Sequence, residues 1–538
     1  MNYEHNWLPE LEGTVPKEAY GYALSNYTIA YEAWRRGLSI TFENLYHNKG
    51  MYYPIYSIYN NDNKVQFTHT RPHLVSKDAV DICVNKQRTR ETLDAHNVPV
   101  PKGRLLKSLA FDQVKKQISD LSFPLVIKPL AGAGGRGVIT GIDSFDELME
   151  NIQYLTEKLN YHQIIVEEYI TGEDYRAFVI GDKVVGAFRR LPPHVIGDGK
   201  STIRELLKKK NKFRVNIPGT YDMKVLINEE IKRELNKQNL TLKSIPEKDQ
   251  FVRLKTKNNV SSGGDPIDAT HELSEDLKEN LVKAVQAIPG LIQGGVDVIY
   301  DKESGRYAIL EINTKPSIRN HLYPIKGNAH EIPKSIIDYY FPETKGKYLS
   351  ETTPKYYFDY SFVKEYLQNN RLKKFTLPTH PYEPNLISKL ITFQSDHELA
   401  KLKQMIRTNF HKLKFNGEMN LISTDQYEII LAGNYQDVEQ FIDFLKSKKF
   451  ISNVQNEHYQ GGVRVGYSFN YKPSEEETVT DAEGTSSLSP IEEKDILASI
   501  EEKDKRIKEL ENEIIQLKNS KSWTVTAPLR KLSKKLNK

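Results

Sequence analysis

The spacing of apolar and polar positions changes several times along the chain, and each spacing predicts a kind of element. Residues 19–37 carry apolar side chains at helical spacing until Gly37, and SITFENL at 39–45 follows as a strand. From about 78 to 345, apolar strands alternate with helices at 144–159, 201–211 and 273–288; the strands are PLVIKP, QIIVEEYI, YRAFVIG, GVDVIYD and YAILEIN. This alternation predicts an α/β (α+β) fold with mixed sheets covered by helices.

The C-terminal third has a different pattern. Between 350 and 470 the order is strand, helix, strand, strand, helix, strand, and GVRVGYSF at 462–469 is the last predicted strand. Residues 471–490 are rich in Glu, Ser and Thr, which is typical of a disordered linker. At 491–520, Ile496, Ile500, Ile507, Leu510, Ile514 and Leu517 keep a spacing of three and four. This spacing predicts a self-associating coiled coil, and the alternative is one amphipathic helix packed on the body. Residues 521–538 are a basic tail, which either touches an anionic membrane surface or a partner or only improves solubility.

Composition narrows the class of protein. With 538 residues, three to four domains are expected, and we divide the chain at 1–77 (a small α/β lobe), 78–345 and 350–470, followed by the linker, coiled coil and tail. The net charge of +5 gives no argument for nucleic acid. Since the chain has neither a signal-peptide pattern nor a long apolar run, we expect a cytoplasmic protein without a transmembrane segment. Cys83 is the one cysteine, which excludes an internal disulfide and a cysteine-ligated zinc site.

The segment VIKPLAGAGGRGV at 126–138 carries the first chemical signal. A strand ends at Lys128, and a loop with four glycines follows, namely Gly132, Gly134, Gly135 and Gly137. Glycines let backbone N–H groups approach phosphate oxygens closely, and a lysine supplies a compact positive charge. The segment lacks the ending of a Walker loop. A phosphate-binding loop and a glycine-rich hairpin turn both fit this segment.

Acidic and amide residues at the ends of later strands favour the phosphate-binding interpretation. Glu167 and Glu168 end one strand, and Asp174 and Arg176 begin the next. Their carboxylates can accept hydrogen bonds from adenine and ribose, and the arginine can hold an anion with two hydrogen bonds. Three oxygen donors are predicted on paired strands: Asp297 on GGVDVIYD, and Glu311 with Asn313 two residues apart on AILEIN. Such a set suits Mg²⁺, and the alternative is that these acids lie on a solvent-exposed face.

Taken together, six blocks of the sequence resemble the ATP-grasp ligases. The resemblance covers about residues 70–345 and is greatest to the branch that contains cyanophycin synthetase and the ligase half of bifunctional glutathione synthetase. The blocks are VNKQRTRETLDAHNVPVPKG, VIKPLAGAGGRGV, VEEYITGEDYRAFVI, RRLPPHVIGDGKSTIREL, FVRLKTKNNVSSGGDPIDAT and GGVDVIYD…LEINTKPSIRNHLYPIKG. The resemblance implies an ATP-grasp fold with mixed or antiparallel sheets. The Mur-ligase-like half and the cysteine-ligase half of the two relatives are both missing here, so their substrates cannot be transferred to this chain.

The resemblance also implies roles for individual residues. Lys86 and Lys128 would contact the nucleotide phosphates, with the glycine loop closing over them. Glu167, Glu168 and Asp174 would hold adenine and ribose, and Asp297, Glu311 and Asn313 would bind the metal. Arg176 and Arg253 would face the reacting acyl phosphate. The family's turn next to the reacting groups corresponds to Asn259, Ser261, Gly263 and Gly264, and a loop that borders the substrates to Arg189, Arg190, His194 and Asp198.

This set of residues implies an ATP-dependent carboxylate–amine ligase. ATP and Mg²⁺, with Mn²⁺ as an alternative, would convert a carboxylate to an acyl phosphate, which a small-molecule or peptide amine attacks to give an amide, ADP and phosphate. The sequence offers no Ser/His/Asp or Cys/His set, and His194 and His321 fit substrate contacts or structural roles better than general bases. A non-catalytic nucleotide-binding adaptor, an acylphosphatase hydrolase and a kinase-like enzyme remain as alternatives.

The unit at 385–470 resembles acylphosphatase in its ferredoxin-like βαββαβ order and in the stretch 416–448. Acylphosphatases need a glycine-rich loop that ends in arginine and an asparagine on the next strand. Here ITFQSDHELAKL takes the place of the loop, and Asn420 is one position away from the expected asparagine. We therefore expect a copy without catalytic activity that serves as a docking or substrate-presenting module.

Overall fold

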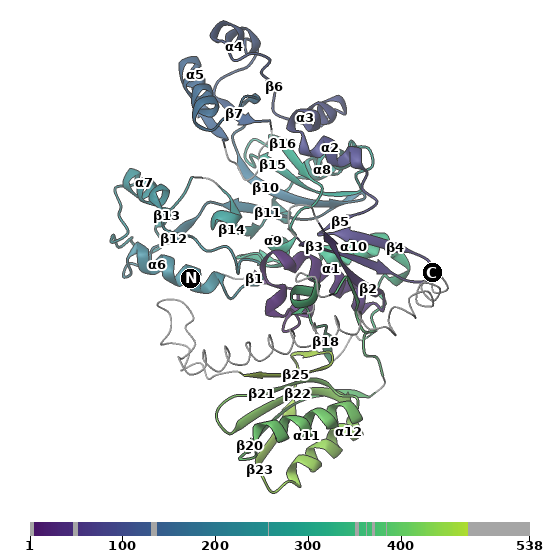
Figure 1. Ribbon diagram of the computed structural model, residues 1–538. Helices are drawn as coiled ribbons and strands as arrows, with labels where there is room; N and C mark the ends of the chain where they lie inside the picture. Colours follow the sequence, from purple (N-terminus) through teal and green to yellow (C-terminus); the bar gives the residue numbers. More distant parts are fainter. Residues whose placement is uncertain are drawn as a thin grey trace, which may run out of the picture. The chain divides into compact units, whose positions relative to one another are not determined.

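The computed structural model describes residues 5–46, 52–130, 137–256, 258–349, 354–361, 363–367, 372–383 and 385–471. The predicted coiled coil, the basic tail and all of the predicted linker except Tyr471 lie outside these residues. So do Gly132, Gly134 and Gly135. Within the described ranges the chain is mixed α/β with largely antiparallel sheets, as the alternation of strands and helices predicted (Figure 1).

The N-terminal lobe is a sheet with the strand order β19-β2-β3-β4-β5. Its strands are β2 (Ser39–Tyr46), β3 (Tyr52–Tyr59), β4 (Lys64–Thr68), β5 (Arg71–Pro72) and β19 (Lys374–Thr376). Helix α1 (Leu24–Arg35) contacts this sheet and also α10 (Ile332–Tyr340). Another short pairing joins the start of the chain, β1 (His5–Asn6), to β17 (Gly327–Asn328). The lobe is therefore completed by segments that lie some 300 residues later in the sequence.

A four-stranded antiparallel sheet contains the strand that ends in Lys128. Its order is β6 (Gly103–Leu105), β9 (Ile164–Glu168), β7 (Leu125–Pro129) and β8 (Ile139–Ile142). Helices α4 (Phe111–Gln117) and α5 (Phe145–Gln153) pack on one face through Val114, Leu148 and Ile152 (Figure 1). Alternate residues of β7 and β9, such as Ile127 and Val166, belong to that core. Lys128 and Glu167 point to the opposite face, since neighbouring residues of a strand alternate.

A five-stranded antiparallel sheet contains the remaining predicted site strands. Its order is β14 (Asp265–Asp268), β11 (Lys183–Leu191), β10 (Glu173–Ile180), β15 (Gln293–Tyr300) and β16 (Tyr307–Asn313). One face packs on α8 (Glu275–Gln286) and on α2 (Lys77–Val84) through Tyr175, Ala177, Val296 and Val298, with Leu281 among their partners. Helix α3 (Lys86–Ala95) follows α2, and the short α9 (Arg319–Leu322) follows β16.

An insertion follows β11. It consists of the paired strands β12 (His194–Ile196) and β13 (Phe251–Arg253) with helices α6 (Ile203–Arg214) and α7 (Glu229–Lys237). Helix α6 begins with a capping box, in which the Thr202 hydroxyl accepts from the backbone of Glu205 and the Glu205 side chain accepts in return from Thr202. The insertion has its own small core, which includes Leu206, Ile231 and Val252.

The last described unit has the predicted βαββαβ order. Its sheet runs β23-β20-β22-β21-β25, and α11 (Leu399–Lys412) and α12 (Tyr435–Lys446) lie on one face (Figure 1). The strands are β20 (Leu386–Ser395), β21 (Asn416–Leu421), β22 (Gln426–Asn434), β23 (Ile451–His458) and β25 (Tyr467–Tyr471). Likeness to acylphosphatase stays a prediction.

The position predicted for the last strand of this unit, GVRVGYSF at 462–469, has to be corrected. The strand that completes the βαββαβ order is β23, whereas 462–469 contributes β24 (Gly462–Arg464), which pairs with β18 (Lys355–Tyr357), and most of β25. β23 is an edge strand whose residues after Ile451 are mostly exposed. It therefore lacks the apolar alternation that marks a half-buried strand.

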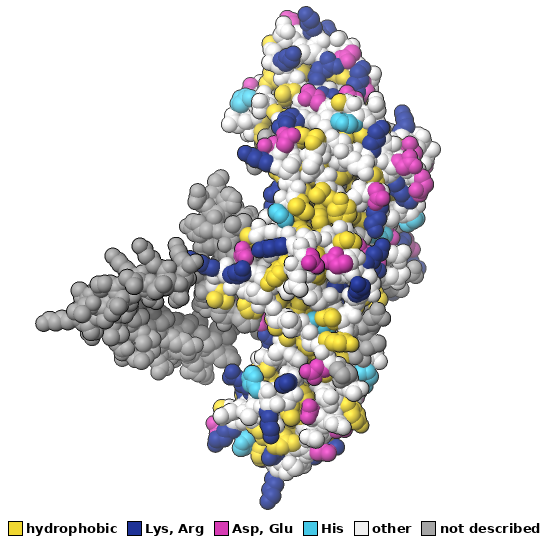
Figure 2. Space-filling view, turned by 90° about the vertical axis from the view of Figure 1, so that its right-hand side faces the viewer, with side chains coloured by type: hydrophobic (Ala, Val, Ile, Leu, Met, Phe, Trp, Pro, Cys, Tyr) yellow, Lys and Arg dark blue, Asp and Glu magenta, His cyan; other side chains and the backbone are white. Residues whose placement is uncertain are grey.

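Two surface observations complete the fold. Among the described residues, no helix is long and apolar enough to cross a membrane. On the face that Figure 2 shows, basic and acidic side chains are interspersed. The charge on this face therefore does not form a patch of one sign.

Candidate active site

The four-stranded sheet presents an ion pair on the face away from its helices. The Lys128 Nζ lies 2.6 Å from Glu167 Oε2, and both side chains are almost fully buried. Glu168 points the other way, and its carboxylate accepts a hydrogen bond from the Ser122 backbone N–H at 2.9 Å. The two adjacent acids, which were predicted together as nucleotide ligands, therefore lie on opposite faces, and only Glu167 shares a face with Lys128.

Lys86 stands at the first position of α3, where the Asn85 side chain caps the helix. Burial lowers the pKa of the Lys86 ammonium, and the positive charge of Lys128 adds to this effect. The carboxylates of Glu311 and Glu167 act in the opposite direction. Because these charges come from both the four-stranded and the five-stranded sheet, Lys86 lies where predicted ligands from the two sheets meet.

The five-stranded sheet carries a row of charged residues in register. Arg176 on β10 faces Asp297 on β15, which in turn faces Glu311 on β16. Arg176 Nε lies 2.5 Å and Nη2 lies 2.6 Å from the two oxygens of Asp297. Arg190 on β11 reaches both Asp297 at 2.8 Å and Asp174 at 2.9 Å. All five side chains lie on the face away from α8, since their neighbours on the strands form the core on the other side.

The two candidate metal-binding carboxylates have different electrostatics. Burial opposes ionisation of Asp297, but Arg176 and Arg190 outweigh it and hold the pKa of this carboxyl below its usual value. Burial raises the pKa of Glu311, and the negative charge of Asp297 raises it further. Asn313 donates from Nδ2 to Glu311 Oε1 at 3.2 Å. The amide and the two carboxylates are thus contiguous.

This donor set fits a hard divalent cation. Mg²⁺ prefers oxygen ligands, and a cation between Asp297 and Glu311 would relieve the repulsion that raises the pKa of Glu311. Within the described ranges, no three His, Cys, Asp or Glu side chains cluster in a way that could hold a metal ion. The predicted set consists of two carboxylates, and the Asn313 amide is its third oxygen donor. Arg176, which already contacts Asp297, also lies 3.8 Å from Glu311 Oε1 through its Nη2.

The turn that was predicted to lie near the reacting groups is tightly built. Asn259 Oδ1 accepts from the N–H and the hydroxyl of Ser261 at 3.0 and 2.7 Å. Gly263 has φ +103°, and a Cβ there would lie 2.3 Å from Val225 Cγ2. A Cβ on Gly264 would lie 2.5 Å from a backbone carbonyl of β11. Both positions therefore require glycine.

A buried ionic cluster that we did not predict holds this turn in place. Asp265, directly after the turn, accepts from Lys210 at 2.7 Å and from Arg214 at 2.5 Å, and all three are buried. Burial lowers the pKa of Lys210, and the positive charge of Arg214 adds to this effect, whereas the Asp265 carboxylate acts in the opposite direction. His194 lies beside the cluster, and its ring stacks on Phe251 at 4.4 Å between centroids; burial lowers its pKa to about 4. Asp265 lies 55 and 51 positions after Lys210 and Arg214, so no local sequence pattern predicted this cluster.

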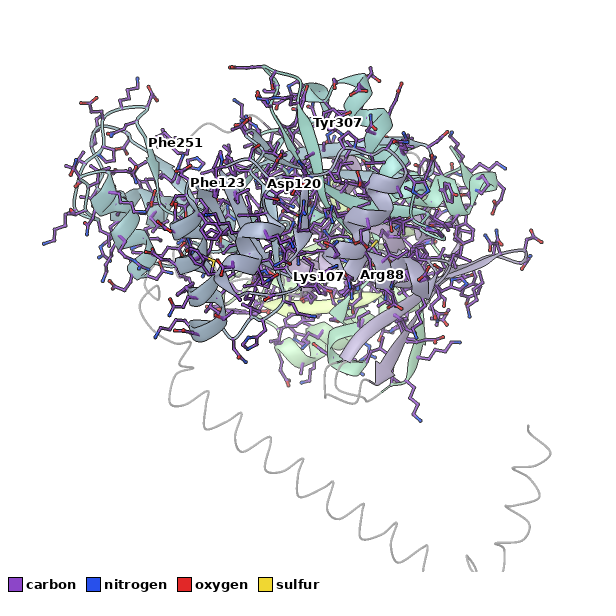
Figure 3. All side chains as sticks on the ribbon, turned by 90° about the horizontal axis from the view of Figure 1, so that it is seen from above. Arg88, Lys107, Asp120, Phe123, Phe251 and Tyr307 are labelled. Atoms are coloured by element: carbon purple, nitrogen blue, oxygen red, sulfur yellow. The ribbon has the colours of Figure 1, made fainter. Side chains whose placement is uncertain are left out.

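Three predicted site residues lie apart from the row on β10, β15 and β16. Arg189 points to the opposite face of the sheet and pairs with Glu173 at 2.5 Å. Arg253 is exposed on β13, at the edge of the insertion (Figure 3 labels its neighbour Phe251). Asp198 is exposed and accepts from the backbone N–H groups of 200 and 201, so it closes a local turn. Gly137, the described end of the glycine loop, has φ +75°.

Part of the chain is similar in sequence to known proteins. Residues 83–201 match the family model described as the RimK-like ATP-grasp domain. The chain is 32% identical over 274 residues to cyanophycin synthetase of Synechocystis sp., which corresponds to 49% of this chain and 31% of the relative. It is 33% identical over 273 residues to the glutathione biosynthesis bifunctional protein of Clostridium perfringens, covering 48% of this chain and 34% of that protein. The chain thus spans about a third of the length of the curated relatives it matches.

Solved structures that are similar to the chain include two ligases. A bifunctional glutathione synthetase from Pasteurella multocida is 27% identical, with a TM-score of 0.44 over 54% of this chain and 40% of that chain. The D-alanine–D-alanine ligase from Bacillus anthracis is 18% identical, with a TM-score of 0.30 over 50% of this chain and 67% of that chain.

Proposed function

From the RimK-like ATP-grasp domain that this chain contains, we propose that the protein is an ATP-dependent carboxylate–amine ligase. It forms an amide bond through an acyl phosphate and releases ADP and phosphate. The observation that carries the proposal is the register of Arg176, Asp297 and Glu311 on three adjacent strands. A carboxylate pair next to an arginine provides the two things that phosphoryl transfer needs, a site for the metal and a positive charge for the transferred group.

The role that we propose for each residue follows from its position in the site. Lys86 and Lys128 bind the phosphates of ATP, and Glu167 holds Lys128 in place through the 2.6 Å ion pair. Asp297, Glu311 and Asn313 would hold Mg²⁺, which supplies charge neutralisation for the phosphates when it is bound. The guanidinium of Arg176 orients the carboxylate of the acid substrate.

The reaction has two steps. A carboxylate oxygen of the acid attacks the γ-phosphorus, and the bond from phosphorus to the ADP oxygen breaks. The neutral amine then attacks the acyl carbon, the bond to the phosphate oxygen breaks, and the amine releases a proton to solvent. Inorganic phosphate leaves with one oxygen that came from the carboxylate.

The transfer of a carboxylate oxygen to inorganic phosphate provides the test. Purified full-length protein is incubated with ATP, Mg²⁺ and pooled amino acids or short peptides whose carboxylates carry ¹⁸O. We expect ADP release that needs both an acid and an amine, and one ¹⁸O in the phosphate, measured by mass spectrometry. Lys128→Ala abolishes both signals, whereas Lys107→Ala, at an exposed lysine, retains them.

Other outcomes would identify the alternatives. Nucleotide binding without ADP release for any acid–amine pair would support the adaptor. Phosphate without ¹⁸O would contradict an acyl phosphate. Hydrolysis of benzoyl phosphate that survives Glu311→Gln would assign a reaction to the βαββαβ unit instead.

The finer proposals concern substrates and assembly. The acid and the amine are small molecules or peptides, and their identity does not follow from relatives that share only a third of their length with this chain. We further propose that the protein acts in the cytoplasm, that residues 491–520 join copies of the chain and that the basic tail at 521–538 meets an anionic membrane surface or a partner.

A further inference from the structure

Three segments from different parts of the fold meet just beyond the predicted metal ligands. The first is residues 20–25 and 69–71 of the N-terminal lobe, the second is the segment 314–321 after β16, and the third is the stretch 217–222 of the insertion. The Thr70 hydroxyl donates to the Pro316 carbonyl at 2.7 Å, and the Ile318 N–H donates to the Ser25 hydroxyl at 3.2 Å. The Gly21 N–H donates to the Pro218 carbonyl at 2.9 Å. The junction is thus fixed by hydrogen bonds.

Positive charge gathers at this junction. Lys315 and Arg319 both lie close enough to His69 to disfavour a proton on its ring, and Arg71 has the same effect on Lys315. Asp222 pairs with Arg319 at 2.6 Å. The junction therefore brings the basic side chains of Arg71, Lys315 and Arg319 close to His69 and to one another.

His69 lies at the centre of the junction. Its side chain is buried (4% exposed), and the ring of Tyr22, which is half-exposed, packs on it at 4.6 Å between centroids. The backbone of Tyr22 is a weak hydrogen-bond partner of the ring, and neither ring nitrogen has a partner of good geometry among the described residues. Buried polar atoms are normally paired, so a buried imidazole that lacks a well-formed hydrogen bond and lies close to Lys315 and Arg319 points to a site that receives a ligand.

The segment after β16 also contains buried polar atoms that lack hydrogen-bond partners among the described residues. Four of its side chains carry a buried polar atom without a described partner, namely Ser317 Oγ, Arg319 Nε, Asn320 Oδ1 and His321 Nδ1. Most other buried atoms of this kind are scattered singly over the described part of the chain. Burial lowers the pKa of His321, and the charges of Arg176 and Arg190 add to this effect. The segment therefore reaches from the junction to the charged row of the candidate active site.

We propose that His69, Lys315 and Arg319 form a binding site for an anionic group, a carboxylate or a phosphate, of the ligase's acid substrate. The ligand's oxygens accept hydrogen bonds from Arg319 Nε and a protonated nitrogen of His69, while Lys315 supplies charge at the open side. Tyr22 covers the site from the N-terminal lobe. This inference rests on the proposed function, because it names a second anionic group on the acid whose reacting carboxylate lies at Arg176.

Two residues of this site come from the N-terminal lobe, outside the range that matches the family model. Tyr22 and His69 precede residue 83, where the match to the RimK-like domain begins. The site therefore selects a substrate with two separated acidic groups through residues that lie outside the matched domain.

Equilibrium binding tests the proposal without any turnover. The full-length protein is saturated with a non-hydrolysable ATP analogue and Mg²⁺, so that the nucleotide's own phosphate sites are filled, and is then titrated calorimetrically with inorganic phosphate or with glutarate. We expect one saturable site, and the anion that binds more tightly identifies the group as phosphate or carboxylate. His69→Gln and Arg319→Lys should each weaken binding about tenfold or more.

Two exposed residues provide matched controls. His73 lies on the same lobe, and Arg233 lies on α7 of the insertion. The His73→Gln and Arg233→Gln variants should both bind the anion as the unchanged protein does. Absence of saturable binding of either anion, or equal binding by the His69 and Arg319 variants, would overturn the proposal. A failed ligase reaction alone would not, since binding is measured without it.

A second experiment measures how a bound anion protects lysines of the unchanged protein from acetylation. Its result does not depend on whether a variant folds. Lys315 is exposed and should be acetylated by a water-soluble succinimidyl ester. The anion that binds should slow acetylation of Lys315 and leave that of Lys326, another exposed lysine, unchanged. Equal acetylation of Lys315 with and without the anion would contradict the site.

Discussion

At the scale of single residues, the proposed chemistry depends on two carboxylates with different surroundings. Asp297 is fully engaged with Arg176 and Arg190, whereas Glu311 has a pKa raised by burial and by its negative neighbour. Glu311 is thus the carboxylate whose charge a divalent cation would stabilise most. Removing this charge should affect metal-dependent catalysis more than it affects folding.

Glu311→Gln should reduce ADP release by at least about a hundredfold, because it removes a metal-binding charge that stabilises the transferred phosphoryl group. The fold should remain, since a neutral side chain of the same shape replaces a carboxyl that burial already disfavours as an ion. ADP release and circular dichroism measure the two effects. Glu303→Gln, in the exposed turn before β16, is the control, and equal activity of the two variants would contradict the role of Glu311.

Cys83 should be unreactive in the folded protein. Burial raises the pKa of its thiol to about 12, so at pH 8 roughly one molecule in ten thousand carries the reactive thiolate. Iodoacetamide should therefore label the protein very slowly until urea unfolds it, as followed by intact mass. Rapid labelling of the native protein would show that the α2 helix opens around this residue.

At the scale of elements, the turn at 259–264 shows how backbone conformation and charge act together. Asn259 shapes the turn from its own side chain, and the buried Asp265 anchors its end to α6 through Lys210 and Arg214. A turn held at both ends can place backbone N–H groups with little conformational freedom.

Gly263→Ala should destabilise the protein by about 1–3 kcal/mol, because the residue must adopt φ +103° and its Cβ would meet Val225. Activity should fall further than stability if the turn borders the reacting groups. Gly305→Ala is the matched control, since it also has positive φ (+69°) but no described atom lies within 4 Å of its Cβ. Thermal unfolding and ADP release should separate the two variants; similar losses in both would remove the turn from the site.

At the scale of the whole molecule, the N-terminal lobe and the region after β16 share one core. Tyr27 and Trp34 of α1 pack with Ile318, Leu322 and residues near 358. Trp34 also donates to the Pro378 carbonyl at 2.7 Å. The predicted boundaries at 77 and 350 therefore run through a common hydrophobic core and not between separate ones.

A chain that begins at residue 78 should consequently aggregate, because the large apolar surface that α1 covers would face water. Soluble expression and size-exclusion chromatography measure this effect. A chain that ends at residue 471 keeps the whole shared core and should stay soluble. A well-folded, active fragment of 78–345 would contradict the shared core.

Deleting residues 491–538 should leave turnover intact and lower the oligomeric state, because the predicted coiled coil is removed while the predicted catalytic residues remain. Sedimentation of the two chains at equal concentration measures the change. If the sedimenting particle contains the same number of chains before and after the deletion, the coiled coil does not join copies of the protein.

Local sequence patterns were enough to predict most elements and the kinds of residue in the candidate site. Alternating apolar positions marked the strands that carry Lys128, Asp297 and Glu311, and the two-residue spacing placed Glu311 and Asn313 on one face, since side chains alternate along every strand. The sequence did not predict the edge strand 451–458, because most of its side chains are exposed and its apolar and polar residues do not alternate.

Only the tertiary structure decided which of these residues meet. The register of β10, β15 and β16 set Arg176 against Asp297 and sent Arg189 to the opposite face, and a strand's register depends on pairing across more than a hundred residues. It also brought His69 to Lys315 and Arg319. Such contacts arise from the packing of distant segments in a common core, and no periodicity within a segment encodes them.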